Sequence, residues 1–187
     1  MALEQISLKI DTPTGDTVPG RGFYQLEEDS LYVQVGEYRD NRGFFNFLES
    51  NTVRFDIDKS GRLLLIEVTL PRRRWEVDSE LTAPTIAESA DIRWLDFRAR
   101  LPEPKLVTNP KQTALLIQFA PDGSWRWFQL AEAVLIQADR NHCLTAVMIT
   151  DIEDDLAGRQ IAAFRHQTRQ KDRRRTKQSH SRRSISG

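Results

Sequence analysis

Apolar and polar residues alternate with a period of two along much of the first 155 residues, which is the pattern of half-buried β-strands. Residues 6–10, 30–35, 53–57 and 62–69 carry this alternation or a β-branched and aromatic composition. Between the last two, Asp58-Lys-Ser-Gly61 supplies the residues of a tight turn, with Gly61 free to adopt a positive φ. The first half of the chain is therefore predicted to form strands, and 53–69 a hairpin.

The second half repeats this order of elements. Strands are predicted at residues 94–99, 114–119 and 125–130, followed by a second hairpin at 134–150. With an offset of 81, residues 53–69 align with it without a gap, and four positions are identical: Val53/Val134, Asp58/Asp139, Leu63/Leu144 and Thr69/Thr150. Upstream, 31–35 aligns with 115–119 after a shift of three residues. Two interpretations stay open, an internal duplication or two unrelated hairpins with a common pattern.

The period changes after residue 150. A cluster of acids at 151–155 favours a helix N-terminus, and Leu156, Ile161 and Phe164 share one helical face. We therefore expect a helix over residues 154–170, packed on the sheet through these three side chains. The remaining residues carry a single large apolar side chain and are expected to be disordered.

The predicted fold is thus mostly β, within the α+β class. Two related antiparallel β units in tandem form a sandwich or a continuous sheet, followed by one C-terminal helix and a disordered basic tail. The expected boundaries are residues 1–80 for the first unit, 90–152 for the second unit packed with it as one globular body, 154–170 for the helix and 171–187 for the tail. Six large residues are expected to be mostly buried: Phe55, Ile57, Leu115, Ile117, Trp125 and Trp127.

A net charge of zero conceals an uneven distribution of charge. From Arg165 to Gly187 nine Lys or Arg residues stand against one acid, Asp172, so this segment carries +8. The chain has 27 basic and 27 acidic residues in all, which leaves −8 for residues 1–164. Such asymmetry is typical of a tail that contacts an acidic partner. Two other interpretations stay open: a solubilising tail, or one that folds back on its own acidic body.

Hydropathy and cysteine content indicate the compartment. Apolar runs reach only three or four residues, whereas a membrane-spanning helix needs ~20, so no membrane contact is expected. No basic stretch followed by an apolar run marks a secretory signal at the N-terminus. Cys143 is the single cysteine, which excludes an internal disulfide and fits a reducing compartment. A cytoplasmic protein is predicted.

Two segments, Glu28-Asp-Ser-Leu-Tyr-Val33 and Phe55-Asp-Ile-Asp-Lys-Ser-Gly-Arg-Leu-Leu-Leu-Ile-Glu-Val68, resemble a short bacterial domain family of unknown function. That family has an Asp-x-Leu-Tyr strand, a variable loop and an Asp-x-Asp-x-x-Gly-x-Leu hairpin that ends in Ile-Glu. The resemblance covers residues 23–70, with a second copy suggested at 106–150 that lacks the Ile-Glu ending, and Leu65 replaces a common Gly. It implies a small β-rich unit and lends no catalytic residue.

Candidate catalytic chemistry is sparse. His142 and Cys143 are adjacent, and adjacent strand residues point to opposite faces, so they do not form a nucleophile and its base. One cysteine and three histidines, two of them in or near the tail, provide no metal site. No cofactor, metal or catalytic residue is therefore predicted.

The preferred hypothesis is a non-enzymatic binding or interaction module whose basic tail contacts an acidic partner, either protein or nucleic acid. The tail residues expected to make this contact are Lys171, Arg173, Arg174, Arg175, Lys177, Arg182 and Arg183. A second candidate is a surface patch that combines bases with an aromatic ring: Arg72, Arg73, Arg74 and Trp75. Exposed strand edges offer a route to oligomerisation. The alternative is an enzyme of unrecognised type with its site in the cleft between the two β units.

Overall fold

The computed structural model describes residues 5–36, 43–97, 100–121, 123 and 125–156. Strands dominate this part of the chain, so the predicted mostly β class is confirmed. The strands are β1 (Leu8–Asp11), β2 (Gly20–Gln25), β3 (Ser30–Val35), β4 (Asn46–Glu49), β5 (Val53–Ile57), β6 (Leu63–Val68), β7 (Glu76–Val77), β8 (Glu88–Ser89), β9 (Asp91–Trp94), β10 (Lys105–Thr108), β11 (Leu115–Gln118), β12 (Arg126–Ala131), β13 (Val134–Ala138), β14 (Leu144–Ile149) and β15 (Glu153–Asp155), and a short 3-10 helix, η1, spans Arg72–Arg74.

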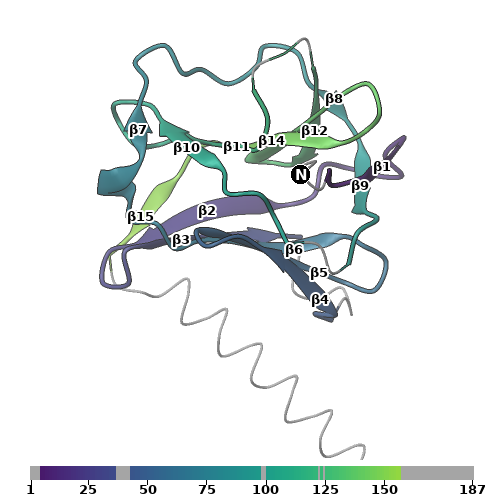
Figure 1. Cartoon of the computed structure of the whole chain (residues 1–187), viewed down its shortest axis with the longest axis horizontal. Coiled ribbons are helices and arrows are strands. Elements are labelled where there is room, and N and C mark those ends of the chain that lie inside the picture. Colours follow the sequence, from purple (N-terminus) through teal and green to yellow (C-terminus); the bar gives the residue numbers. More distant parts are fainter. Residues whose placement is uncertain (1–4, 37–42, 98–99, 122, 124, 157–187) are drawn as a thin grey trace, which may run out of the picture.

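Two sheets lie face to face, and a two-stranded ribbon joins them at one side (Figure 1). The six-stranded sheet has the order β15-β2-β3-β6-β5-β4, and the seven-stranded sheet has the order β7-β10-β11-β14-β13-β12-β8. The ribbon pairs β1 with β9. The tandem units therefore form two layers, each burying one apolar face against the other, rather than one continuous sheet.

Strands β1–β7 recur as β9–β15 with the same order of pairing. Within the β5–β6 hairpin Val53 lies opposite Val68, and 81 residues later Val134 lies opposite Ile149. Both hairpins also shift register at the same point, one residue before the end of the first strand. The neighbouring strands β3 and β11 pair with β6 and β14 in matching register. The strand order predicted for the two halves is thus found in both sheets.

The two hairpin turns are built alike. Asp58 accepts backbone N–H bonds from the residues two and four positions ahead, at 2.8 and 3.0 Å, and Asp139 accepts the equivalent pair at 2.8 Å each. The last turn residue has a positive φ in both, 81° at Gly61 and 59° at His142. A side-chain acceptor that satisfies the turn's backbone donors fixes where each hairpin reverses.

The edge strands are exchanged between the halves. β7 follows β6 along the chain but pairs in parallel with β10, and β15 follows β14 but pairs in parallel with β2. The predicted first unit, residues 1–80, thus contributes residues 76–77 to the sheet built mainly by the second half. Because each sheet is completed by a strand from the other half, the two halves are interlocked.

The core between the sheets draws on both halves. Phe55 has no exposed surface and contacts Trp94 and Phe119 edge to face, with ring centroids 6.0 Å apart in each pair. At Gly22, an added Cβ would lie 3.1 Å from a methyl group of Ile149, so glycine lets β2 approach the opposite sheet closely. Four of the six residues predicted to be buried lie in this core: Phe55, Ile57, Leu115 and Ile117.

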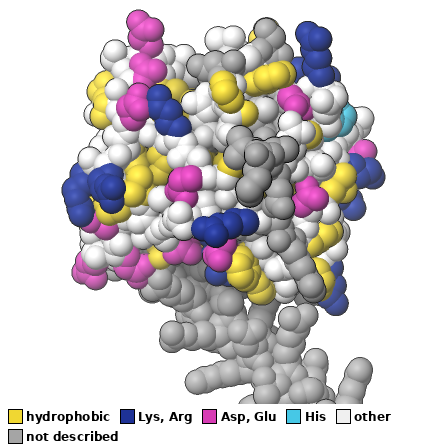
Figure 2. All heavy atoms as spheres, in the orientation of Figure 1, with side chains coloured by type: hydrophobic (Ala, Val, Ile, Leu, Met, Phe, Trp, Pro, Cys, Tyr) yellow, Lys and Arg dark blue, Asp and Glu magenta, His cyan; other side chains and the backbone are white. Residues whose placement is uncertain are grey.

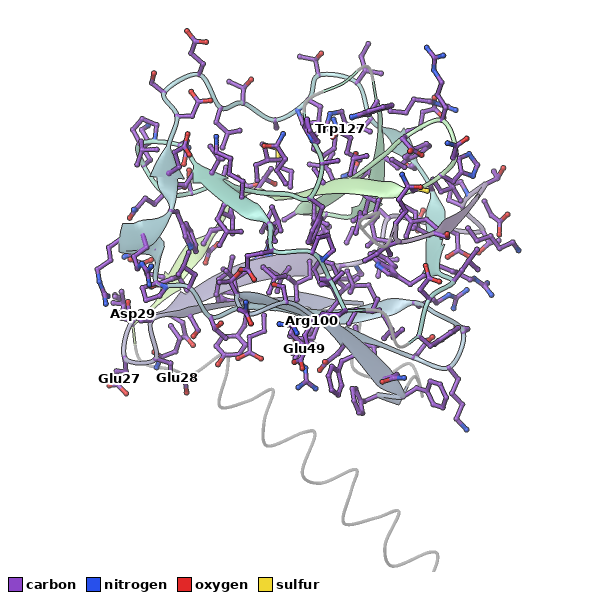
Figure 3. All side chains as sticks on the ribbon, in the orientation of Figure 1. Glu27, Glu28, Asp29, Glu49, Arg100 and Trp127 are labelled. Atoms are coloured by element: carbon purple, nitrogen blue, oxygen red, sulfur yellow. The ribbon has the colours of Figure 1, made fainter. Side chains whose placement is uncertain are left out.

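Trp125 and Trp127 are less completely buried than the other four and lie outside the core between the sheets. In β12 the core-facing residues are Phe128 and Leu130, which places Trp127 on the outer face (Figure 3). Within residues 125–130, large apolar side chains occur on both faces of the strand: Trp125 and Trp127 on one, Phe128 and Leu130 on the other. The sequence pattern therefore could not tell which phase faces the core.

The predicted C-terminal helix does not begin at residue 154. Residues 153–155 form β15, and Leu156, expected to pack on the sheet, has a side chain that is 77% exposed. The free edge of β2 offers backbone hydrogen bonds to this segment, and pairing there satisfies donors that a helix N-terminus would leave open. The rest of the predicted helix and the predicted disordered tail lie outside the described residues.

Candidate interaction face

Part of the outer face of the seven-stranded sheet is apolar and buried, although the same face also carries Lys105, Gln118, Gln129 and Gln137, which are exposed or half-buried. Val107, Leu135, Ala146 and Met148 point away from the central core, yet each is at most 9% exposed. β7 and β8 lie at opposite edges of this sheet, and the chain that joins them passes over its outer side (Figure 1). We call this segment, residues 78–87, the strap.

The fully extended length of the strap is close to the width of the sheet that it crosses. Six strand spacings of ~4.8 Å separate β7 from β8, about 29 Å in all. Ten residues in an extended conformation span ~33 Å. The strap begins with the Asp78 N–H donating to the Thr108 carbonyl oxygen at 2.8 Å, and its first residues form a turn in which the Leu81 N–H donates to the Asp78 carbonyl oxygen at 3.3 Å.

The outer face of the six-stranded sheet, which we call the open face, has a different character. Its residues form two rows across the strands: Phe23, Tyr32, Glu67, Arg54 and Glu49 in one, and Arg21, Gln34, Leu65, Asp56 and Phe47 in the other. Arg21 and Glu49 are exposed and the other eight are half-buried. Aromatic rings, a leucine and charges of both signs thus share one surface.

Arg54 organises the end of the open face at β4. Its Nε donates to Asp56 at 2.7 Å, and its guanidinium lies 4.1 Å from the centroid of the Phe47 ring and 6.0 Å from that of Phe44. The two rings stack on each other, 6.5 Å apart. Burial raises the pKa of Asp56, while the Arg54 hydrogen bond opposes that shift. The arginine is held between a carboxylate and two aromatic rings, a favourable cation–π arrangement.

Aromatic side chains extend from this cluster to the sheet edge. Phe44 and Phe45 are 51% and 50% exposed, and Phe45 contacts Phe97 edge to face at 6.0 Å. This group was not among the residues predicted to form a site. Its signal is three phenylalanines within residues 44–47, followed by a strand that carries an arginine on the same face. Exposed aromatic patches of this kind mark interaction surfaces.

The edge of β4 is partly occupied. Glu49 forms a parallel bridge with Arg100, whose place beside it is visible in Figure 3, and the Glu49 carbonyl oxygen accepts the Leu101 N–H at 2.9 Å. The other edges of the two large sheets are strands of two or three residues. Short edges resist edge-to-edge pairing, so oligomerisation through strand edges stays a prediction.

An acidic turn, residues 27–29, lies between β2 and β3 at the other end of the open face (Figure 3). Asp29 accepts a hydrogen bond from the Tyr24 hydroxyl at 2.8 Å and forms an ion pair with Arg73. These hydrogen bonds, the one from Arg73 above all, lower the pKa of Asp29. The turn is thereby connected to η1.

Arg72 fixes β15 at the point where the chain leaves the sheet. Its guanidinium donates to both oxygens of Asp154, at 2.5 and 3.3 Å, and lies 4.4 Å from the centroid of the Tyr24 ring. Its backbone N–H donates to the Tyr24 hydroxyl at 3.0 Å. Burial is the main cause of a raised Tyr24 pKa. The chain that follows β15 therefore starts from a defined position.

The predicted surface patch at residues 72–75 is divided. Trp75 is 4% exposed and its indole N–H donates to the Leu70 carbonyl oxygen at 2.9 Å, so it cannot stack on a ligand and the prediction is corrected there. Arg72 and Arg73 bind acidic side chains, and Arg74 is exposed. Figure 2 shows basic and acidic side chains side by side on this flank. The patch is interrupted because η1 turns the chain so that the Trp75 ring points into the protein.

A pocket of about 210 Å³ lies between the two halves. Residues 13–18, Arg62, Asp91 and part of β12 line it. Asp91 is committed to ion pairs with Arg62 at 3.5 Å and Arg93 at 3.3 Å. Asp16 is exposed at the rim. The pocket thus brings together one neutralised and one solvated carboxylate.

The tail residues predicted to contact a partner, from Lys171 to Arg183, lie outside the described residues. Within the described part of the chain, no three His, Cys, Asp or Glu side chains are grouped to hold a metal ion. No helix described there is long and apolar enough to cross a membrane. Cys143 is a buried free thiol, and burial raises its pKa, while His142 is exposed in the turn.

Fold and faces together define a class: an interlocked two-layer β protein in which, among the described residues, the strap crosses one outer face and no segment crosses the other. No family model matches the chain, and no curated protein matches it. The resemblance of residues 23–70 to a bacterial domain family therefore stays a prediction. Function has to be inferred from the chain's own chemistry.

Proposed function

We propose that the protein is a non-enzymatic interaction module whose basic C-terminal tail binds nucleic acid. The observation that carries this proposal is the distribution of charge. Nine bases and one acid fall in residues 165–187, whereas residues 1–164 carry −8. Because the acidic part repels a polyanion, attraction concentrates in the tail.

The composition of residues 171–187 suits contact with phosphate. Seven of these residues are Lys or Arg: Lys171, Arg173, Arg174, Arg175, Lys177, Arg182 and Arg183. Neutralising phosphates releases condensed counterions and needs charge density rather than a shaped groove. The Arg72–Asp154 contact holds β15, the last strand among the described residues.

Titration of labelled single- and double-stranded oligonucleotides of unrelated sequence, at two salt concentrations, tests the proposal. Affinity should be independent of sequence and fall steeply with salt, with log K against log[salt] sloping by about −0.7 per phosphate on single strands and −0.9 on duplex. Replacing the seven tail bases by glutamine should abolish binding. A control, Lys59→Gln with Arg140→Gln, removes exposed bases from the two hairpin turns and should leave affinity within about twofold.

No binding by the intact chain at low salt would contradict the proposal, and an acidic protein would then be the partner to test. A chain that ends at residue 170 should lose binding while its thermal midpoint stays within about 1 °C, since a solvated tail buries no apolar surface. A fall of several degrees would show that residues 171–187 dock on the body instead.

A second candidate function rests on the pocket between the halves, where the enzyme hypothesis places its site. Its basic group is Arg62, whose Nε is buried without a hydrogen-bond partner among the described residues. A small anion that raises the thermal midpoint of the intact protein, but not of Arg62→Gln, would favour ligand binding there. If no small anion raises the thermal midpoint in this way, the interaction module remains the better account.

A further inference from the structure

We propose that the pocket between the two halves binds a short-chain carboxylic acid, with its carboxylate at Arg62 and its alkyl chain on the apolar floor of the pocket. The inference goes beyond the nucleic-acid proposal. It rests on the second candidate function, anion binding in this pocket, and it names the class of ligand. Three observations carry it: the lining of the pocket, the loose ion pairs at its rim, and a comparison with the equivalent place in the other half.

The pocket has an apolar floor and a polar rim. The floor is formed by residues of the core between the sheets: Val35, Leu63, Ala90, Ile92 and Leu130. At the rim, residues 13–17 form an exposed loop, and the Arg62 side chain is 33% exposed. The volume of about 210 Å³ is below the ~300–1,000 Å³ of sites for drug-sized ligands, so the pocket suits a ligand of few heavy atoms. A ligand that is apolar at one end and polar at the other matches both parts of the lining.

Arg62 has spare hydrogen-bonding capacity at the rim. Its one hydrogen bond within the described part of the chain runs from Nη2 to Asp91 Oδ2, at 3.5 Å. Arg93 donates to the same oxygen at 3.3 Å, and the Nε atom of each arginine is buried without a partner among the described residues. Charge-assisted N–H···O bonds are normally ~2.7–2.9 Å long, and three other arginine–carboxylate pairs here close to between 2.5 and 2.7 Å. Two guanidinium groups therefore share one distant oxygen, which leaves donors for a second carboxylate.

The repeat provides a matched place in the other half. The Trp94 N–H donates to the Gly61 carbonyl oxygen at 2.7 Å, and the Leu8 N–H donates to the His142 carbonyl oxygen at 2.9 Å. Gly61 and His142 end the two equivalent hairpin turns, and Trp94 and Leu8 lie opposite each other in the β1–β9 ribbon (Figure 1). The ribbon therefore meets each turn in the same way, and the residues around the two junctions can be compared position by position.

The matched place carries neutral side chains. Arg62 and Cys143 each follow the last turn residue, and Asp91 and Gln5 each lie three residues before the ribbon residue that donates to the turn. The Cys143 thiol donates to Gln5 Oε1 at 3.7 Å, where Arg62 donates to Asp91 at 3.5 Å. Since the fold builds this junction with an uncharged pair, the charged pair is not needed to form it. A ligand can therefore engage Arg62 without opening the junction.

Charge and shape favour a carboxylate over a phosphate. Arg62 and Arg93 against Asp91 leave a surplus of one positive charge, which a carboxylate neutralises. A phosphate group, with a charge of about −1.5 to −2, exceeds that surplus, and the exposed Asp16 at the rim repels a second negative charge. A planar carboxylate also matches the fork of N–H donors on a guanidinium. An alkyl chain attached to the carboxylate would bury apolar surface on the floor.

Titration of the full-length protein with sodium acetate, propionate and butyrate tests the proposal. Binding is followed by the NMR shifts of the backbone amides, which should change most at Leu63, Ala90 and Gln129 in the pocket lining. Each added CH₂ group that becomes buried should raise the affinity about fourfold. Butyramide has nearly the same shape without the charge, and it should bind at least about tenfold more weakly than butyrate.

Substitutions in the full-length chain locate the binding. Arg62→Gln should weaken butyrate binding at least about tenfold, and the variant should stay folded because the other half tolerates a neutral pair at this place. The matched control, Arg140→Gln, removes an exposed arginine from the equivalent turn and should leave the affinity within about twofold. Replacing the seven tail bases by glutamine should also leave it within about twofold, whereas a loss of binding there would place the acid on the tail and overturn the proposal.

An absence of shift changes at millimolar butyrate would overturn the proposal, as would equal affinity for butyrate and butyramide or an unchanged affinity in Arg62→Gln. Equal affinity for acetate and butyrate would overturn the ligand class while leaving anion binding at Arg62 intact. The chain-length series and butyramide need no substitution, so they decide even if Arg62→Gln does not fold. Nucleic-acid binding is tested with the tail-substituted protein, which should lose oligonucleotides and keep butyrate, so the two proposals can fail separately.

Discussion

The two sheets share a strand order and register, and some outer-face positions match, such as Gln34 with Gln118 and Arg21 with Lys105, but others differ sharply. Met148 in the covered sheet corresponds to Glu67 in the open one, and Leu135 corresponds to Arg54. The covered face needs the strap because part of it is apolar, whereas an antiparallel sheet with charges on one side tolerates water there. The comparison shows that backbone pairing fixes the layers, and that side chains on the outer faces decide which one is available for contacts.

The largest expected effect is the loss of stability when inner-face residues are truncated, and it should be similar in the two sheets. Phe55→Ala should lower the free energy of unfolding by about 3–5 kcal/mol, and Ile136→Ala, its equivalent in the other sheet, by about 2–5 kcal/mol, through lost burial plus a cavity. Denaturant unfolding measures both. A loss below about 1 kcal/mol at Phe55 would mean that the assigned inner face is wrong.

The equivalent turns should respond differently to the same substitution. Gly61→Ala should cost about 2–4 kcal/mol, because φ is 81° and an added Cβ would collide with the Trp94 carbonyl oxygen. His142→Ala should change stability by less than about 0.5 kcal/mol, since His142 already carries a Cβ at a φ of 59°. If Gly61→Ala costs no more stability than His142→Ala, the backbone near Gly61 must move to avoid the collision.

The outer faces offer the sharpest matched pair. Met148→Ala should cost about 2–3 kcal/mol because the side chain is 1% exposed beneath the strap. Glu67→Ala, at the equivalent position of the open face, should cost less than about 1 kcal/mol, since a partly solvated charge contributes little. Denaturant unfolding of the two variants compares the faces directly, and equal costs would remove the distinction between them.

The smallest effect concerns reactivity rather than stability. Cys143 is 8% exposed, and burial raises the pKa of its thiol. Less thiolate is then present at neutral pH, so iodoacetamide should modify the folded chain at least about tenfold more slowly than the unfolded chain at pH 7. The rate should rise as the pH passes above the usual thiol range. Mass spectrometry with and without denaturant follows the reaction, and equal rates would show that β14 opens at this end.

Local signals in the sequence were sufficient for both hairpins and for several other strands, but β2, β4, β7, β8, β10 and β15 were not predicted, and the strand predicted at 94–99 starts where β9 ends. The alternation at residues 53–57 and the turn residues 58–61 predicted the first hairpin, and an offset of 81 predicted the second in the observed register. These features depend on period and on φ preferences within a few residues, which a sequence displays directly. For the same reason the buried positions at Phe55 and Ile117 were predicted correctly.

By itself, then, the sequence determined a repeated β pattern, its inner-face residues in most strands and the separation of an acidic body from a basic tail. Only the tertiary structure decided the pairing of β15 with β2, the passage of the strap over one sheet and the outward phase of Trp127. Parallel pairing between segments more than 100 residues apart depends on which edge is free in the assembled fold, and no local pattern records that. Which face is covered likewise depends on where two edge strands lie, so this protein's open surface becomes visible only once both sheets are built.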